Sequence, residues 1–144
     1  NITVSNGLAF SQRDNIMYFA DTPTGRIQKF SYNQDFKKLN ELESNMIFKD
    51  VGEPDGATLD NDDNYWSARV RGKCIICIDT KNGKIIEKID LPTSTPTCVT
   101  FGNSDLSCLY VTSLRADPIN DSADGNLYKI KTGTQGSVQL LADF

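Results

Sequence analysis

The stretch PDGATL at residues 54–59, followed by YWSAR at residues 65–69, decides the fold of this chain. It joins a polar residue and a glycine to an apolar segment, and then adds a second segment that carries an aromatic residue. Related pairs occur about 45 residues away on either side, which indicates one supersecondary unit used three times. They are SNGLAF (5–10) with MYFAD (17–21), and PTCVTF (96–101) with LYVTS (109–113).

Short apolar runs bounded by Gly, Pro, Asn and Asp recur along the whole chain, and this spacing is typical of an antiparallel all-β fold. Each copy has room for four strands, which is the blade of a β-propeller. Tight turns are expected at TPTG (22–25) and at the Asn-Gly pair at 82–83. We predict strands at 7–10, 16–20, 26–32 and 45–49, with 38–44 as a loop, then at 57–60, 65–69, 73–79 and 85–90, and finally at 98–101, 108–113, 126–131 and 138–142.

Three blades leave two open flanks, whereas propellers typically close with four to eight blades. The sequence therefore predicts three four-stranded blades that form half of a six-bladed β-propeller, with blades at about 1–53, 54–95 and 96–144. The chain starts at Asn1 and no leader sequence follows, so we expect a truncated or partly observed protein. The other half either precedes this segment or comes from another copy.

Composition and charge limit the classes of function. The chain has 38% hydrophobic and 24% charged residues, values of an ordinary globular domain without a membrane span. Its net charge is −4, from 15 basic and 19 acidic residues, and the basic residues are scattered along the chain. We therefore expect no nucleic-acid partner, no membrane partner and a cytoplasmic location.

The chain contains no histidine, which excludes Ser-His, Cys-His and histidine-ligated zinc chemistry within this segment. Its four cysteines all lie in apolar strand contexts, and we expect them to be buried and structural. Cys74 and Cys77 form a CxxC pattern, but a strand directs these two side chains to opposite faces, and no second ligand pair accompanies them. Catalysis in this segment must use carboxylates, amides or a hard metal ion.

The polar residue that begins each copy is the candidate site. It is Asn6 in the first copy, Asp55 in the second and Thr97 in the third. The innermost strand of each propeller blade lines the channel, so equivalent strand starts converge at one mouth. Asn6 and Asp55 are therefore within reach of one ligand, and their oxygens suit calcium or magnesium. Asn-Gly and Asp-Gly are also good turn formers, which is the structural alternative.

Other polar and aromatic residues favour structural roles. The run DNDDN at 60–64 lacks the glycine and the final glutamate of an EF-hand loop, and we interpret it as a solvated turn. Tyr18, Trp66 and Tyr110 occupy matching places in the second strands and are expected to pack between blades. Arg69 and Arg115 follow second strands and face either a ligand or solvent.

Taken together, SNGLAFS (5–11), MYFADT (17–22), PDG (54–56), NYWSA (64–68), PTCVTFG (96–102) and LYVTS (109–113) resemble the regucalcin and gluconolactonase family, which includes luciferin-regenerating enzymes. Their order and spacing cover nearly the whole chain, and the resemblance is to the C-terminal half of that family. It implies a six-bladed propeller that holds one divalent cation, with calcium as the first candidate and zinc, magnesium or manganese as alternatives. It further implies that Asn6 and Asp55 are metal ligands and that Asp55 is either the general base or a group that positions the attacking water.

This resemblance predicts a metal-dependent hydrolase of sugar lactones, with a small lactone as substrate. The alternative is a non-catalytic calcium-binding regulatory propeller, and a third reading is an interaction platform without a cation. The family's third ligand, a glutamate, and its substrate-orienting residues belong to the N-terminal half. Two protein ligands leave most of the six to eight oxygens that calcium prefers to water. We therefore expect function to need the missing N-terminal half.

Overall fold

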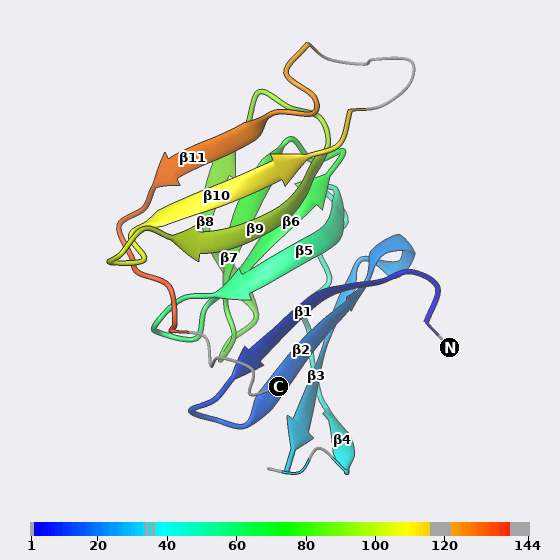
Figure 1. Cartoon of the computed structure of the whole chain (residues 1–144). Coiled ribbons are helices and arrows are strands. Elements are labelled where there is room, and N and C mark those ends of the chain that lie inside the picture. The colour runs from blue at the N-terminus through cyan, green and yellow to red at the C-terminus, as the bar shows by residue number, and fades with distance from the viewer. Residues whose placement is uncertain (1, 34, 36, 116–121, 139–144) are drawn as a thin grey trace.

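The computed structural model describes residues 2–33, 35, 37–115 and 122–138. These residues form three antiparallel sheets, two of four strands and one of three (Figure 1). The first sheet has the order β1(Ser5–Ser11), β2(Ile16–Asp21), β3(Arg26–Tyr32), β4(Leu39–Leu42). The second has β5(Glu53–Leu59), β6(Tyr65–Val70), β7(Cys74–Asp79), β8(Lys84–Asp90), and the third β9(Pro96–Gly102), β10(Cys108–Ser113), β11(Leu127–Lys131).

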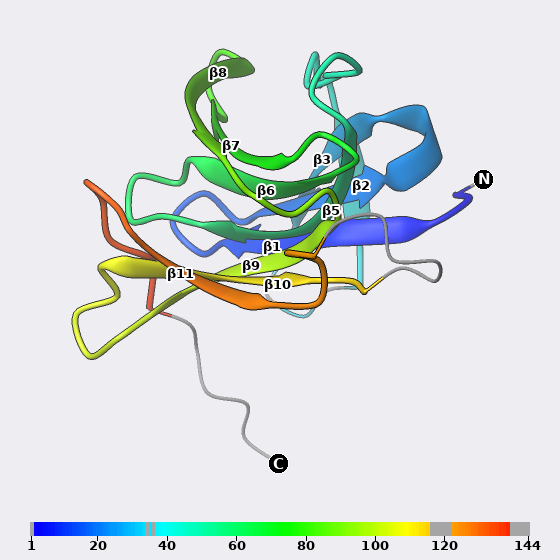
Figure 2. The ribbon, with the colours of Figure 1, turned by 90° about the horizontal axis from the view of Figure 1, so that it is seen from above.

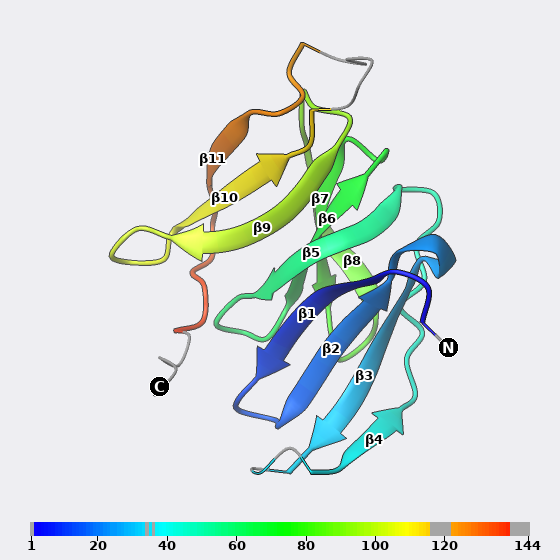
Figure 3. The same cartoon turned by 45° about the vertical axis from the view of Figure 1, so that its right-hand side comes forward.

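This architecture confirms the all-β fold and the propeller blades expected from the repeat. The strands β1, β5 and β9 begin their sheets and lie next to one another, with arrowheads that point the same way (Figures 1 and 3). The second sheet lies between the first and the third (Figures 1 and 3), and in the view from above its outer strand β8 lies on the side away from β9–β11 (Figure 2). The starts of these three inner strands therefore gather at one end of the molecule, and their ends gather at the other.

Two apolar clusters hold the sheets together. The first lies between the first and second sheets and includes Tyr18, Tyr65 and Ile76, and the second joins the second and third sheets through Trp66 and Val99. Both faces of the middle sheet are covered, which explains why the interior of β6 and β7 is buried at successive positions rather than at alternate ones. Isoleucines and cysteines fill β7 for that reason.

The aromatic residues of the second strands follow this packing. Tyr18 contacts Tyr65 with ring centroids 5.6 Å apart, and Trp66 contacts Phe101 at 5.8 Å. Both predictions of core packing are thus confirmed. Tyr110 is only half-buried, and its hydroxyl donates to Asn103 Oδ1 at 2.8 Å. Tyr110 is the counterpart of Trp66 in the repeat. The side chain of Trp66 packs against the third sheet, whereas no further sheet covers Tyr110 within the residues described.

The expected loop at 38–44 is wrong, since residues Leu39–Leu42 form β4 and pair with β3. All four residues of β4 are exposed, so no alternation of buried and exposed side chains marked this strand in the sequence. The predicted strand at 45–49 is reduced to a bridge between Ile47 and Arg26. The edge of β3 is therefore covered by two short segments instead of one continuous strand.

The turns at 22–25 and 82–83 are confirmed. Residues Thr22–Thr24 form a 3-10 turn that ends at Gly25, and the N–H of Gly83 donates to the carbonyl of Asp79. The predicted strand at 138–142 lies outside the described residues except for Val138, which is not in a strand. No helix in the described part of the chain has the length and apolar character needed to cross a membrane.

Candidate functional site

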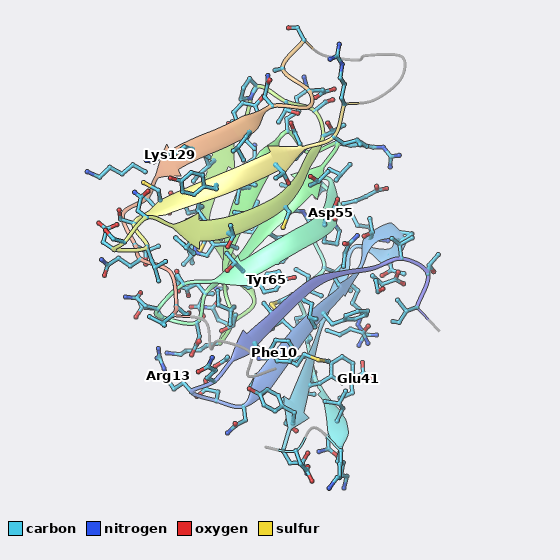
Figure 4. All side chains as sticks on the ribbon, viewed as in Figure 1. Phe10, Arg13, Glu41, Asp55, Tyr65 and Lys129 are labelled. Atoms are coloured by element: carbon cyan, nitrogen blue, oxygen red, sulfur yellow. The ribbon has the colours of Figure 1, made fainter. Side chains whose placement is uncertain are left out.

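Asn6 and Asp55 lie near the starts of two adjacent inner strands. Asn6 is the second residue of β1 and Asp55 the third residue of β5, and both side chains are partly exposed. Figure 4 places Asp55 at the start of its strand, on the side where β1 also begins. The structure therefore brings the two sequence-predicted residues to the same end of neighbouring strands.

Asn6 and Asp55 do not lie in turns, as their Asn-Gly and Asp-Gly sequences suggested. They lie in strands that each contain a β-bulge, in which one strand has one residue more than the strand it pairs with. Between Asn6 and Ala9, β1 has one residue more than the segment of β2 it faces, and β5 has the same irregularity between Pro54 and Ala57. The third sheet has a matching one near Pro96. Such bulges redirect side chains locally and are frequent beside active sites. The alternation of apolar and polar residues does not reveal such bulges, so the Asn-Gly and Asp-Gly sequences suggested turns.

Glycine is required in both bulges because neighbouring elements approach closely. Gly7 has φ +59°, and a Cβ atom at this position would lie 2.1 Å from the hydroxyl oxygen of Tyr65. That hydroxyl donates to the carbonyl of Gly7 at 2.6 Å, which links the second sheet to the bulge of the first. A Cβ on Gly56 would lie 2.7–2.9 Å from three atoms of Cys98 on β9. The bulges are thus packed against the next blade.

Asn6 is oriented by Thr22, a residue that no sequence motif assigned to the site. The amide nitrogen of Asn6 donates to Thr22 Oγ1 at 2.8 Å, and Thr22 Oγ1 donates to the carbonyl of Pro54 at 2.8 Å. The side-chain carbonyl oxygen of Asn6 is left as a ligand atom. This chain of hydrogen bonds also ties Asn6 to the residue that precedes Asp55.

Burial raises the pKa of the Asp55 carboxyl above its ordinary value, and the backbone N–H of Gly56 offsets part of this effect. Within the described residues, no side chain donates a hydrogen bond to this carboxylate. A half-buried carboxylate without a side-chain donor is stabilised by a cation placed beside it. The donor set of one amide oxygen and one carboxylate therefore fits a hard divalent cation in chemistry, although it provides only two protein ligands.

The third copy of the repeat adds no strong ligand. Thr97 Oγ1 lies 2.9 Å from Thr112 Oγ1, so the two hydroxyls pair with each other. No group of three or more His, Cys, Asp or Glu that could hold a metal ion occurs in the described part of the chain. In the described residues, the oxygen donors at this end of the inner strands are therefore limited to Asn6 and Asp55.

A hollow of about 330 Å³ lies beside Asn6 and extends across the inner strands. Its wall includes apolar atoms from Leu8, Phe19 and Ala57, together with the thiol-bearing Cys98. Cys98 is exposed, in contrast to the expectation that all four cysteines are buried, because its side chain points into this hollow from the inner strand β9. Cys74 and Cys77 are buried in different clusters on opposite faces of β7, as predicted.

Arg69 faces neither ligand nor solvent, which corrects both alternatives. It is fully buried, and its Nη2 donates to the carbonyls of Phe48 and Gly52 at 2.6 Å each. Burial lowers the pKa of Arg69 to about 10. Arg69 therefore anchors the segment that leads into β5 and Asp55. Arg115 is exposed.

The run at 60–64 forms a turn, as expected, but two of its carboxylates, those of Asp60 and Asp63, are buried rather than solvated. Asp60 accepts hydrogen bonds from the N–H groups of Asp62 and Asn64 and from Trp66 Nε1. This network positions the turn that follows β5 and occupies both carboxylate oxygens of Asp60. The exclusion of an EF-hand therefore agrees with the geometry.

The model of the family described as "SMP-30/Gluconolactonase/LRE-like region" matches residues 1–115. A 6-deoxy-6-sulfogluconolactonase of Pseudomonas putida is 36% identical over 116 residues, which cover 80% of this chain and 40% of that protein. A regucalcin of Sus scrofa is 31% identical over 137 residues, which cover 90% of this chain and 45% of that protein. The chain thus spans less than half the length of these two relatives.

Among solved structures, a calcium-binding protein, regucalcin, from Agrobacterium tumefaciens superposes with a TM-score of 0.86. The alignment covers 99% of this chain and 50% of that chain, at 23% identity. This similarity concerns the fold. Together with the three sheets described above, it supports an architecture of half a propeller.

Proposed function

Because the chain belongs to the SMP-30/gluconolactonase/LRE-like family, we propose that it is part of a metal-dependent hydrolase of sugar lactones. The observation that carries this proposal is the placement of Asn6 and Asp55 at the starts of adjacent inner strands. The relative from Pseudomonas putida, named as a sulfogluconolactonase, supports a lactone as substrate.

In this proposal the side-chain oxygen of Asn6 and the carboxylate of Asp55 hold one divalent cation, with calcium as the first candidate. When bound, such a cation polarises a lactone carbonyl and stabilises the negative charge that develops on its oxygen. Thr22 keeps the amide of Asn6 in the orientation that presents oxygen to the cation. Asp55 additionally accepts the proton of the attacking water. Leu8 and Phe19 line the hollow in which the apolar edge of the substrate lies.

The remaining ligands and the substrate-orienting groups are proposed to come from sequence outside these residues. The two ligands found here are too few for a calcium ion that takes six to eight oxygens. The chain also covers less than half of each curated relative described above. The active unit in this proposal is therefore the complete propeller.

The test measures hydrolysis of a panel of sugar lactones by the intact protein, with and without EDTA. Chelation is expected to abolish turnover, and added calcium to restore it. Asp55→Ala is expected to lower kcat by about 10²–10⁴, the range of general acid–base catalysis, because the proton acceptor is removed. Asp50→Ala, at an exposed carboxylate outside the site, is the matched control and keeps full activity.

Activity that survives both EDTA and Asp55→Ala would contradict this mechanism. A calcium-binding regulatory propeller without turnover is the second candidate, because a regucalcin is among the relatives. It is favoured by calcium binding that depends on Asn6 and Asp55 and by no hydrolysis of any lactone in the panel. Calorimetric titration with calcium therefore separates the two candidates when it is run beside the activity assay.

A further inference from the structure

A second hollow, of about 440 Å³, lies at the other end of the inner strands. Its wall is formed by the segments that follow β1, β5 and β9, together with residues 135–138. Figure 4 labels Asp55 at the start of β5 and Arg13 beyond the end of β1. The two hollows share no lining residue.

Asp63 gives this hollow an unusual feature. The residue is only 7% exposed, and its Oδ2 has no hydrogen-bond partner within the described residues. The nearest positive charge is the Nε of Arg13, 3.4 Å from that oxygen. A buried carboxylate oxygen without a donor is costly unless a ligand or water supplies one. The backbone holds Asp63 in place, since Thr80 Oγ1 donates to its carbonyl.

The surrounding groups combine hydrogen-bonding side chains with an apolar surface. Arg13 is exposed, and one of its terminal nitrogens donates to the carbonyl of Asn61, which fixes the guanidinium beside Asp63. Gln135 uses its amide nitrogen on the carbonyl of Asp105, so its oxygen remains as an acceptor. Phe10 and Leu106 supply apolar atoms to the same wall.

We propose that this hollow binds a polyhydroxylated small molecule, a sugar or sugar acid, with one hydroxyl donating to Asp63 and a neighbouring oxygen accepting from Arg13. Vicinal hydroxyls both donate and accept hydrogen bonds, which matches an acceptor and a donor held 3.4 Å apart. The C–H face of such a ligand packs on Phe10 and Leu106. A cation is disfavoured because the Arg13 charge lies beside Asp63, and the Asp105 carboxylate already accepts from Ser107.

The proposal is tested by calorimetric titration of the intact protein with D-glucose and with D-gluconate, in the presence of EDTA. EDTA removes the metal-dependent site from the measurement, so this test is independent of the proposed lactone hydrolysis. Both probes are expected to bind, and a preference for gluconate over glucose would show that Arg13 pairs with the carboxylate. Acetate, an anion without hydroxyls, serves as the control ligand.

Asp63→Asn and Arg13→Gln are each expected to weaken binding at least about tenfold, because each removes one charged hydrogen-bond partner. Asparagine tolerates the φ of 63° at position 63, so the first variant keeps the turn, and Arg13 is exposed, so the second does not threaten folding. The matched control is Asp62→Asn, the same change at the exposed neighbouring residue, and it leaves binding unchanged.

Three outcomes with the sugar and acetate probes would overturn the proposal. These are no binding of either sugar, equal binding of acetate, or sugar binding that is unaffected by both Asp63→Asn and Arg13→Gln. Calcium binding without EDTA that depends on Asp63 would replace the polyol by a cation and would overturn it as well.

Discussion

The hydroxyl of Tyr65 is a single contact on which the bulge beside Asn6 depends. It is fully buried and donates to the carbonyl of Gly7 at 2.6 Å. Tyr65→Phe keeps the ring but leaves that carbonyl without its donor, so we expect the free energy of unfolding at neutral pH to fall by about 1–3 kcal/mol. Urea denaturation measures the change. Tyr32→Phe, at a partly exposed tyrosine, is the control and is expected to lose less.

The same hydroxyl predicts a pH dependence. Burial raises the pKa of the Tyr65 phenol, so the folded state retains this proton more strongly than the unfolded state. The stabilisation is fully present below the ordinary tyrosine pKa of about 10 and is lost as the pH rises above it. The difference in unfolding free energy between wild type and Tyr65→Phe is therefore expected to shrink in alkaline buffer. A difference that stays constant with pH would contradict this assignment.

Individual polar residues show where sequence reasoning stops. Asn6 and Asp55 could be selected because a repeated position carried oxygen donors, and the structure places them on adjacent strands. The role of Arg69 could not be assigned, because its acceptors are the backbone carbonyls of Phe48 and Gly52, about 20 residues away. Every residue has a backbone carbonyl, so the sequence does not indicate which ones accept a hydrogen bond. Thr22 was missed for the same reason.

At the scale of elements, the inner strands β5 and β9 approach each other closely at Gly56 and Cys98. The backbone conformation of Gly56 does not itself require glycine. A Cβ at this position, however, would lie 2.8 Å from the Cα of Cys98. Gly56→Ala therefore must push the two strands apart, and we expect a loss of about 1–3 kcal/mol in unfolding free energy. Gly133→Ala is the matched control, since nothing lies within 4 Å of its added Cβ. Chemical denaturation compares the two variants, and equal stability would refute the packing argument.

The strands themselves were largely predictable because each is bounded by turn residues and carries β-branched or aromatic side chains. β10 has the predicted bounds, and β2, β6 and β11 differ by one residue. β4 could not be predicted because it is exposed along its whole length and is held only by backbone pairing with β3. The bulges were hidden for a related reason, since one additional residue changes the register without changing composition.

At the scale of the whole molecule, burial is uneven. The middle sheet is covered on both faces, whereas the third sheet presents half-buried Tyr110 where the middle sheet has fully buried Trp66. The three sheets thus behave as a stack in which each blade completes the core of the one before it. A fourth blade against Tyr110 would continue the series, as in a propeller of six.

This incompleteness leads to the last prediction. When produced as these 144 residues alone, the protein is expected to bind calcium at least about tenfold more weakly than the intact propeller and to hydrolyse no lactone, because two ligands leave most of the coordination shell to water. Parallel calcium titrations and lactone assays of the two forms measure this difference. Asn6→Ala in the intact propeller is the internal reference, since it removes one proposed ligand while all blades remain. Equal calcium affinity in both forms would mean that Asn6 and Asp55 suffice to bind calcium. The proposal that further ligands come from the rest of the propeller would then be wrong.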